Sequence, residues 1–304
     1  MSRLKLNQLQ MLIAVIDSRS FGSAAVQIGC TQSRVSHAIS ELEEVLGVRL
    51  LLRSRSGCEP TDAGHRVVAK ARQILSLSDS LMDDAKDDLV IEGRVRIACF
   101  RSVSTHLLPH ALKALTQEHP GVRVDVDDNY EEREDVELAV ARGRADLGIA
   151  QLPVGPEMTA FPYLSDSYVV VTPSSSSLRT PISWTQLHNL PYIQLNCSGA
   201  RAVLERCRNA GFQSEPSLTV ATDSSVLAMV SQGMGCSFLP HLAVFPPPVG
   251  VKVHELPIAA KRQFSVIALP KLARSKPVKV VIQAIRAERN SKMSHAFRAG
   301  IVHW

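Results

Sequence analysis

The spacing of apolar residues changes once along the chain, near residue 93, and this change limits the possible folds most strongly. Before it, apolar side chains recur every three or four residues, which places them on one face of a helix. After it, short apolar stretches that predict strands alternate with segments that predict helices, as in a parallel sheet covered by helices. The sequence therefore predicts a helical N-terminal module followed by an α/β region, and 304 residues suffice for two or three domains.

Three helices are predicted in the first 47 residues. The first covers residues 6–18, the second lies between Ser20 and Gly29, and the third lies between Thr31 and Gly47. Ser and Thr are favoured before a helix because the hydroxyl accepts a free backbone N–H, and Gly readily adopts the left-handed backbone that ends one. Two short helices joined by so few residues are typical of a helix-turn-helix.

The outer face of the third predicted helix carries small or hydrogen-bonding side chains, whereas a purely solvated face would more often carry Glu and Lys. Such side chains can reach base edges in the major groove of DNA, and Arg and Ser can contact phosphates. We therefore expect this helix to read DNA. The candidate contacts are Thr31, Gln32, Ser33, Arg34, Ser36 and His37.

An apolar run and an Arg-rich turn follow Gly47, and together with Gly57 they predict a two-stranded wing. Arg53 and Arg55 lie in this turn, where they can contact the DNA backbone. The alternative is that both arginines are simply solvated.

A long helix of about 25 residues is predicted after Thr61. Val67, Ile74 and Leu81 repeat every seven residues along it, which gives the helix one apolar face. Such a face needs a partner to bury it. Packing onto its own domain is one alternative, but we favour dimerisation, because a helix-turn-helix usually reads paired half-sites as a dimer.

The charge distribution fits this division better than the net charge of +5 does. Residues 1–72 contain ten basic residues (Lys and Arg) and six acidic ones (Asp and Glu), and residues 73–92 contain one basic and six acidic residues. Residues 93–269 contain fifteen basic and sixteen acidic residues, and residues 270–304 contain eight basic residues and one acidic residue. The pattern predicts a basic N-terminal module, an acidic linker and a nearly neutral domain. We expect the basic residues 291–304 to form a solvated tail.

Residues 6–64 resemble the winged helix-turn-helix of LysR-type transcriptional regulators. The resemblance rests on residues 31–43, 46–50, Arg53 and 61–64, whose order and spacing follow the family pattern. It implies a DNA-binding regulator with an N-terminal winged helix-turn-helix, a long linker helix and a C-terminal effector domain.

The α/β region resembles the effector domain of the same family, which is similar to periplasmic binding proteins, through residues 107–109, 143–149 and 233–240. The predicted strands are 94–100, 122–127, 146–150, 168–172, 192–195, 218–222, 236–239 and 263–269, and the predicted helices are 104–118, 131–142, 199–210, 224–232 and 277–289. The implied division is a DNA-binding domain at 1–64, a linker at 65–92 and an effector domain at 93–304, with subdomain I at about 93–164 and 263–290 and subdomain II at about 165–262.

The resemblance implies that a small-molecule effector binds in the cleft between the subdomains, where strands end and helices begin. Free N–H groups at helix N-termini suit anions, so we expect a carboxylate or another anion. Ser102 falls at the family's polar effector position, and each candidate has the alternative of being a simple cap or loop residue. The candidates are Arg101, Ser102, Ser104, Asn129, Tyr130, Gln151, Asn196, Ser198 and Thr222.

The predicted function is a cytoplasmic regulator that binds a double-stranded DNA operator as a homodimer or homotetramer, with RNA polymerase as a further partner. We expect no cofactor, and no metal because no Cys/His cluster has the spacing of a zinc site. We expect no membrane partner, because no apolar run approaches the 20 or so residues of a membrane span.

Two alternatives remain. A thiol-based redox-sensing regulator of the same family would use Cys197 and Cys207, which flank the predicted helix 199–210. An enzyme or solute-binding protein on the same scaffold is disfavoured, because the sequence offers no catalytic constellation and no export signal.

Overall fold

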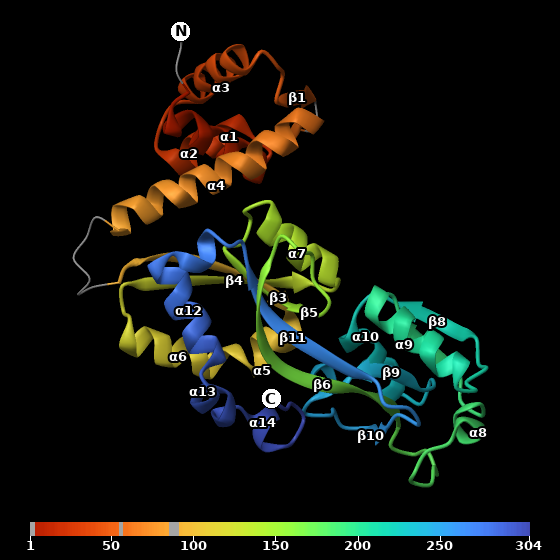
Figure 1. Cartoon of the computed structure of the whole chain (residues 1–304). Coiled ribbons are helices and arrows are strands. Elements are labelled where there is room, and N and C mark those ends of the chain that lie inside the picture. The colour runs from red at the N-terminus through yellow and green to blue at the C-terminus, as the bar shows by residue number, and fades with distance from the viewer. Residues whose placement is uncertain (1–3, 55–56, 85–90) are drawn as a thin grey trace.

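The chain forms a helical N-terminal domain, one long linker helix and two α/β lobes (Figure 1). The computed structural model describes residues 4–54, 57–84 and 91–304. The predicted fold class is confirmed. Within the described residues, the helices are too short or too polar to cross a membrane. Arg55 lies outside the described residues, and so does the side chain of Arg53.

The N-terminal domain is built as the capping residues predict. Its elements are α1 (Leu6–Ser18), α2 (Phe21–Ile28), α3 (Gln32–Leu46) and the antiparallel wing strands β1 (Leu51–Ser54) and β2 (Gly57–Pro60). Ser20 caps α2 and Thr31 caps α3, each accepting a backbone N–H. Gly29 and Gly47 end the same helices with φ of 72° and 66°, the left-handed region that Gly adopts without strain.

The linker helix α4 (Asp62–Asp84) begins where Thr61 accepts the N–H of Gly64 at 2.9 Å. Val68 and Ala71 are buried in the core of the N-terminal domain, so the first half of the apolar face packs onto its own domain. Beyond that point Ile74 and Leu81 are 41% and 70% exposed. Packing onto its own domain therefore applies to the first half of the helix, and dimerisation remains the prediction for the exposed second half.

Lobe I contains residues 91–167 and 261–304. Its strands are β3 (Gly93–Phe100), β4 (Val122–Tyr130), β5 (Leu147–Gln151) and β11 (Lys261–Ala268), and its helices include α5 (Arg101–His106), α6 (Leu108–Glu118), α7 (Arg133–Ala141) and α12 (Lys276–Arg286). β3 lies between β4 and β5 and runs parallel to both. The single helix predicted at 104–118 is two helices, because Pro109 lacks the N–H that a helix interior needs and stands in the first turn of α6.

Lobe II contains residues 168–260. It holds β7 (Tyr192–Leu195), β8 (Pro216–Val220), β9 (Ser237–Pro240) and β10 (Val251–Glu255), together with α8 (Trp184–Leu187), α9 (Ser198–Asn209), α10 (Asp223–Ser231) and α11 (His241–Val244). β6 (Thr159–Pro173) joins the lobes: its first half pairs with β11 in lobe I and its second half with β9 and β10 in lobe II. The prediction found only the second half of β6.

A buried ion pair lies on these joining strands. Asp166 on β6 stands opposite Arg262 on β11, and the guanidinium donates to both carboxylate oxygens at 2.8 Å. The side chains are 0% and 6% exposed. Burial lowers the pKa of Arg262, but the charge and hydrogen bonds of Asp166 outweigh it and raise that pKa. The pair fixes β6 to β11 where the chain passes between the lobes.

The expected solvated tail is wrong. Residues 288–304 form α13 (Glu288–Met293), α14 (His295–Arg298) and a final segment that packs on lobe I. Val302 is 1% exposed, and His303 exchanges two backbone hydrogen bonds with Ser165 at 2.7 and 2.9 Å. The Trp304 ring meets Tyr163 edge-on at 5.9 Å. Apolar side chains anchor the segment while its basic ones face solvent, which charge counting alone does not reveal.

Candidate functional site

The first candidate site is the outer face of α3, which lies on the side of the N-terminal domain turned away from the lobes (Figure 1). Val35, Ile39 and Leu42 bury the inner face in the domain core. The side chains of Gln32, Ser33, Arg34 and His37 are exposed, and Ser36 is half-buried. The helix therefore presents its first two turns as a polar surface, with Thr31 capping the end of the helix.

His37 is oriented by a carboxylate that the sequence analysis did not single out. Its Nε2 lies 3.3 Å from Glu41, one turn later on α3. Gln8 on α1 is 2% exposed and donates to the other oxygen of Glu41 at 3.0 Å. The buried amide holds Glu41, which places a carboxylate beside His37 at the edge of the polar surface.

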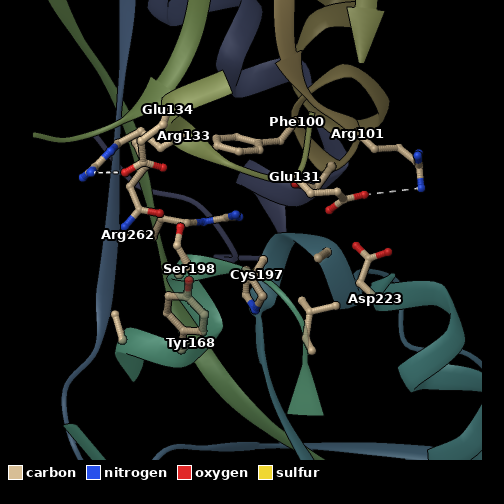
Figure 2. Close-up of a pocket in the computed structure, with 17 residues that line it drawn as sticks. Phe100, Arg101, Glu131, Arg133, Glu134, Tyr168, Cys197, Ser198, Asp223 and Arg262 are labelled. Atoms are coloured by element: carbon tan, nitrogen blue, oxygen red, sulfur yellow. Dashed lines mark hydrogen bonds and ion pairs between the residues drawn. The ribbon is translucent and has the colours of Figure 1, made fainter. Parts of the chain in front are cut away.

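The second candidate site is a cleft of about 200 Å³ between the lobes (Figure 2). It lies where β3, β4 and β5 end and where α5, α7, α9 and α10 begin, the arrangement that favours ligand binding in α/β folds. Its lining residues are Phe100, Arg101, Ser102, Glu131, Arg133, Glu134, Gln151, Tyr168, Leu195, Cys197, Ser198, Gly199, Ala202, Asp223, Pro240, Ala243 and Arg262.

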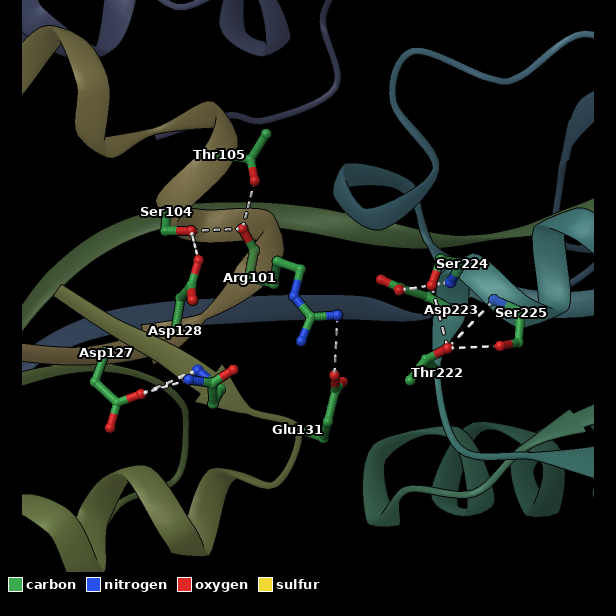
Figure 3. Close-up of polar contacts among 11 residues, drawn as sticks. Arg101, Ser104, Thr105, Asp127, Asp128, Glu131, Thr222, Asp223, Ser224 and Ser225 are labelled. Atoms are coloured by element: carbon green, nitrogen blue, oxygen red, sulfur yellow. Dashed lines mark hydrogen bonds and ion pairs between the residues drawn. The ribbon is translucent and has the colours of Figure 1, made fainter. Parts of the chain in front are cut away.

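The lobe I wall offers one unused hydroxyl. Ser102 in the first turn of α5 is 8% exposed, and within the described residues nothing forms a hydrogen bond with its side chain. Arg101 beside it is 46% exposed and lies 3.8 Å from Glu131 (Figure 3). Ser104 turns the other way, because its hydroxyl donates to Asp128 at 2.5 Å and so fastens α5 to β4.

The lobe II wall adds a phenol and a carboxylate. Tyr168 is 5% exposed, and burial raises its pKa to about 12, so its hydroxyl is protonated at neutral pH. A Cβ on Gly199 would lie 2.8 Å from that hydroxyl, so only Gly lets α9 approach it so closely. Asp223 opens α10, and Thr222 caps that helix by accepting the N–H of Ser225 at 3.3 Å.

Carboxylates of the two lobes face each other at this cleft. Glu131 comes from lobe I and Asp223 from lobe II (Figure 3). Burial raises the pKa of Glu131, the negative charge of Asp223 raises it further, and Arg101 opposes both. The cleft is therefore lined by carboxylates that the sequence analysis did not name, together with the arginines Arg101, Arg133 and Arg262.

A third acidic residue bridges the lobes directly. Glu132, just before α7, accepts the backbone N–H of Ser198 at 2.9 Å on one oxygen and 3.0 Å on the other. The Ser198 hydroxyl donates to the same carboxylate, and Arg201 lies 3.8 Å from it. The polar atoms of Ser198 are thus already engaged.

The structure brings together four of the nine candidates for effector binding, namely Arg101, Ser102, Gln151 and Ser198. The other five lie outside the cleft lining: Ser104, Asn129, Tyr130, Asn196 and Thr222. Three of these five bond elsewhere: Ser104 to Asp128, Asn129 to Asp127 and Asn196 to Arg201. The acidic residues Glu131 and Glu134 at the start of the predicted helix 131–142 could have indicated further lining residues, whereas nothing local marks Tyr168 or Arg262.

The two cysteines of the redox alternative are poorly placed for it. Cys197 precedes α9 and Cys207 lies in its last turn, so about 15 Å of helix separates them, far beyond the 7 Å limit for a disulfide. Burial raises the pKa of Cys197 and raises that of Cys207 to about 12, although the charge of Arg206 acts against the latter shift. Both thiols therefore stay protonated at neutral pH, which makes them poor nucleophiles.

The chain matches two family descriptions that together span most of its length. Residues 6–65 match the bacterial regulatory helix-turn-helix protein of the lysR family, and residues 90–290 match the LysR substrate binding domain. The chain belongs to the LysR family of transcriptional regulators. The prediction of a LysR-type regulator with effector-modulated activity is confirmed.

Relatives of this LysR-type regulator differ in the roles that their names state. A Synechococcus elongatus protein named "Probable HTH-type transcriptional regulator LrrA" is 37% identical over 85% of this chain and 88% of its own length. A Streptomyces viridosporus protein named "Probable hydrogen peroxide-inducible genes activator" is 32% identical over 79% of this chain and 78% of its own.

Solved structures share the fold of this LysR-type regulator. A full-length OxyR variant from Pseudomonas aeruginosa has a TM-score of 0.76 at 20% identity and covers 97% of this chain and 98% of its own. The LysR family regulator CbnR, solved in complex with its target DNA, has a TM-score of 0.66 at 20% identity and covers 94% of this chain and all of its own.

Proposed function

We propose that this LysR-type regulator reads its operator with the outer face of α3, through Gln32, Ser33, Arg34, Ser36 and His37, while Thr31 caps the helix. The observation that carries the proposal is the exposed polar surface at the N-terminal end of a well-capped helix, because that end contacts base edges in helix-turn-helix proteins. Arg53 and Arg55 of the wing are proposed to contact phosphates.

The regulator is proposed to act as a homodimer or homotetramer held by the exposed half of α4. Ile74 and Leu81 lie two helical turns apart and remain open to solvent. Leu81→Lys should lower the dimer affinity measured by sedimentation without unfolding the single chain, since Leu81 is 70% exposed there. A variant that sediments as the wild type does would contradict this assignment.

The cleft is proposed to bind a small-molecule effector. Effector binding is proposed to change the arrangement of the lobes and so to alter the contacts of the oligomer with DNA and RNA polymerase. Ser102 and Tyr168 support this role, because both are buried, carry a hydroxyl and line the cleft. A ligand that raises the melting temperature of the wild type but not that of Ser102→Ala would identify the site.

Selection from random-sequence DNA tests the DNA-reading function. The full chain should enrich a sequence with two half-sites that are separated by about 10 base pairs or a multiple of that. Binding should weaken steeply with salt, because phosphate contacts release counterions. Failure to enrich any sequence would contradict the proposal.

A further inference from the structure

A carboxylate of the chain itself occupies the start of α9. Glu132 belongs to lobe I and directly precedes α7, whereas Ser198 and Arg201 belong to the first turn of α9 in lobe II. Three donors of lobe II converge on this one side chain: the Ser198 N–H, the Ser198 hydroxyl and, at 3.8 Å, the Arg201 guanidinium. Hydrogen bonds to a charged carboxylate are roughly twice as strong as neutral ones.

This position is where a negatively charged effector group would be expected to bind. The first N–H groups of a helix have no partner inside the helix and carry its positive end, and α9 is twelve residues long. A ligand anion and the Glu132 carboxylate therefore need the same donors. They cannot share the position, because two like charges at that spacing repel each other.

Glu132 can leave this position without a rearrangement of the fold. Its side chain is 28% exposed, so it has solvent on one side into which it can rotate. The lining of the adjacent cleft carries three carboxylates and three arginines, so its charges balance and the competition for the donors of α9 falls to Glu132 itself.

We propose that Glu132 is a latch: it holds the lobes together by filling the anion position of α9, and an anionic effector acts by displacing it. The inference rests on the proposed function, because it takes the cleft to be the effector site. Displacement breaks the link between α7 and α9 and so converts ligand binding into a change in the arrangement of the lobes. Glu132 thereby also sets the charge that an effector must carry at this position.

Sulfate binding by the full chain tests the competition. Glu132→Gln removes the charge, Glu132→Ala removes the side chain, and both should bind inorganic sulfate at least about tenfold more tightly than the wild type, because the competitor is gone. Thermal shifts are measured with sodium sulfate against sodium chloride at equal ionic strength. Glu134→Gln is the matched control, since Glu134 lines the same cleft but bonds to Arg133 instead. Equal sulfate affinity in the wild type and Glu132→Ala would overturn the proposal.

Hydrogen exchange tests the link between the lobes. In Glu132→Ala, amides of residues 100–106 in lobe I and 222–227 in lobe II should exchange faster together, by about tenfold or more, if a hydrogen-bonded link has been lost. A change confined to residues 197–201 would show a local contact only and would overturn the latch.

Two further comparisons keep this test decisive. If Glu132→Ala exchanges fast throughout, Ser198→Ala takes its place, because it removes the hydroxyl but keeps the backbone donor, and it should give a smaller rise in the same two segments. No rise there would again contradict the latch. Operator binding by the wild type is a separate measurement, so failure of the latch and failure of the proposed function are distinguishable.

Discussion

The buried pair of Asp166 and Arg262 gives the strongest prediction about stability. Asp166→Asn keeps the shape of the side chain and an acceptor for the Leu242 N–H, which the carboxylate now binds at 3.0 Å, but leaves the Arg262 charge without its partner. Both side chains are almost fully buried. Removing one member of such a pair costs about 3–5 kcal/mol, because the remaining charge cannot return to water.

The loss should be visible by calorimetry on the full chain. For a domain of this size each kcal/mol lowers the melting temperature by about 2–4 °C, so a loss of about 3–5 kcal/mol in Asp166→Asn should lower it by about 6–20 °C. Asp125→Asn is the matched control, because the ion pair of Asp125 with Arg94 is exposed and should contribute less than about 1 kcal/mol. A double substitution, Asp166→Leu with Arg262→Met, should recover part of the loss, since it removes the unpaired charge. An Asp166→Asn protein that melts within about 2 °C of the wild type would refute the reasoning.

Three further predictions concern the cleft, the thiols and the C-terminal segment. Because the pKa of Glu131 is raised in the folded state, protonation of Glu131 stabilises that state. This contribution to the free energy of unfolding is present below the ordinary Glu pKa of 4.5 and is lost as pH rises through the raised pKa. Glu131→Gln should therefore be more stable than the wild type in urea unfolding at pH 7, with the difference shrinking towards pH 4; a less stable variant would contradict this. Peroxide treatment of the full chain should give no Cys197–Cys207 disulfide by mass spectrometry, and Cys207→Ser should leave any transcriptional response to peroxide unchanged; a disulfide would revive the redox alternative. Val302→Asp should lower stability by about 3 kcal/mol because it buries a carboxylate, whereas His295→Asp at an exposed position of the same segment should not; equal effects would mean that the segment does not pack as described.

Local interactions explain why the N-terminal domain could be predicted from the sequence. Ser20 and Thr31 cap helices with hydroxyls three residues from their donors, and Gly29 and Gly47 end the same helices, so each boundary depends on neighbouring residues alone. The strands β3 and β5 were predictable for a similar reason, since apolar residues alternate with arginines at the start of β3 and follow one another in β5.

Features that depend on distant segments were not predictable. The first half of β6 contains Pro162 and polar residues and is a strand only because β11 pairs with it. The final segment packs through Val302 against lobe I, although its composition indicates a solvated tail. The contact of Glu132 with Ser198 joins residues 66 positions apart and exists only because the lobes meet. The lining of the cleft also depends on how the lobes meet, so some of the candidates predicted at strand ends lie outside it.

The central claim is that α3 reads base sequence, and the most direct measurement compares affinities for the selected operator and for scrambled DNA at one salt concentration. Gln32→Ala should lower the ratio of the two affinities by about 1–3 kcal/mol, or roughly 5- to 150-fold, while affinity for scrambled DNA stays nearly the same. Gln117→Ala, the same change at an exposed position of α6 in lobe I, should leave the ratio unchanged. If Gln32→Ala keeps the ratio of the wild type, Gln32 does not read the operator, and the proposed recognition surface is wrong.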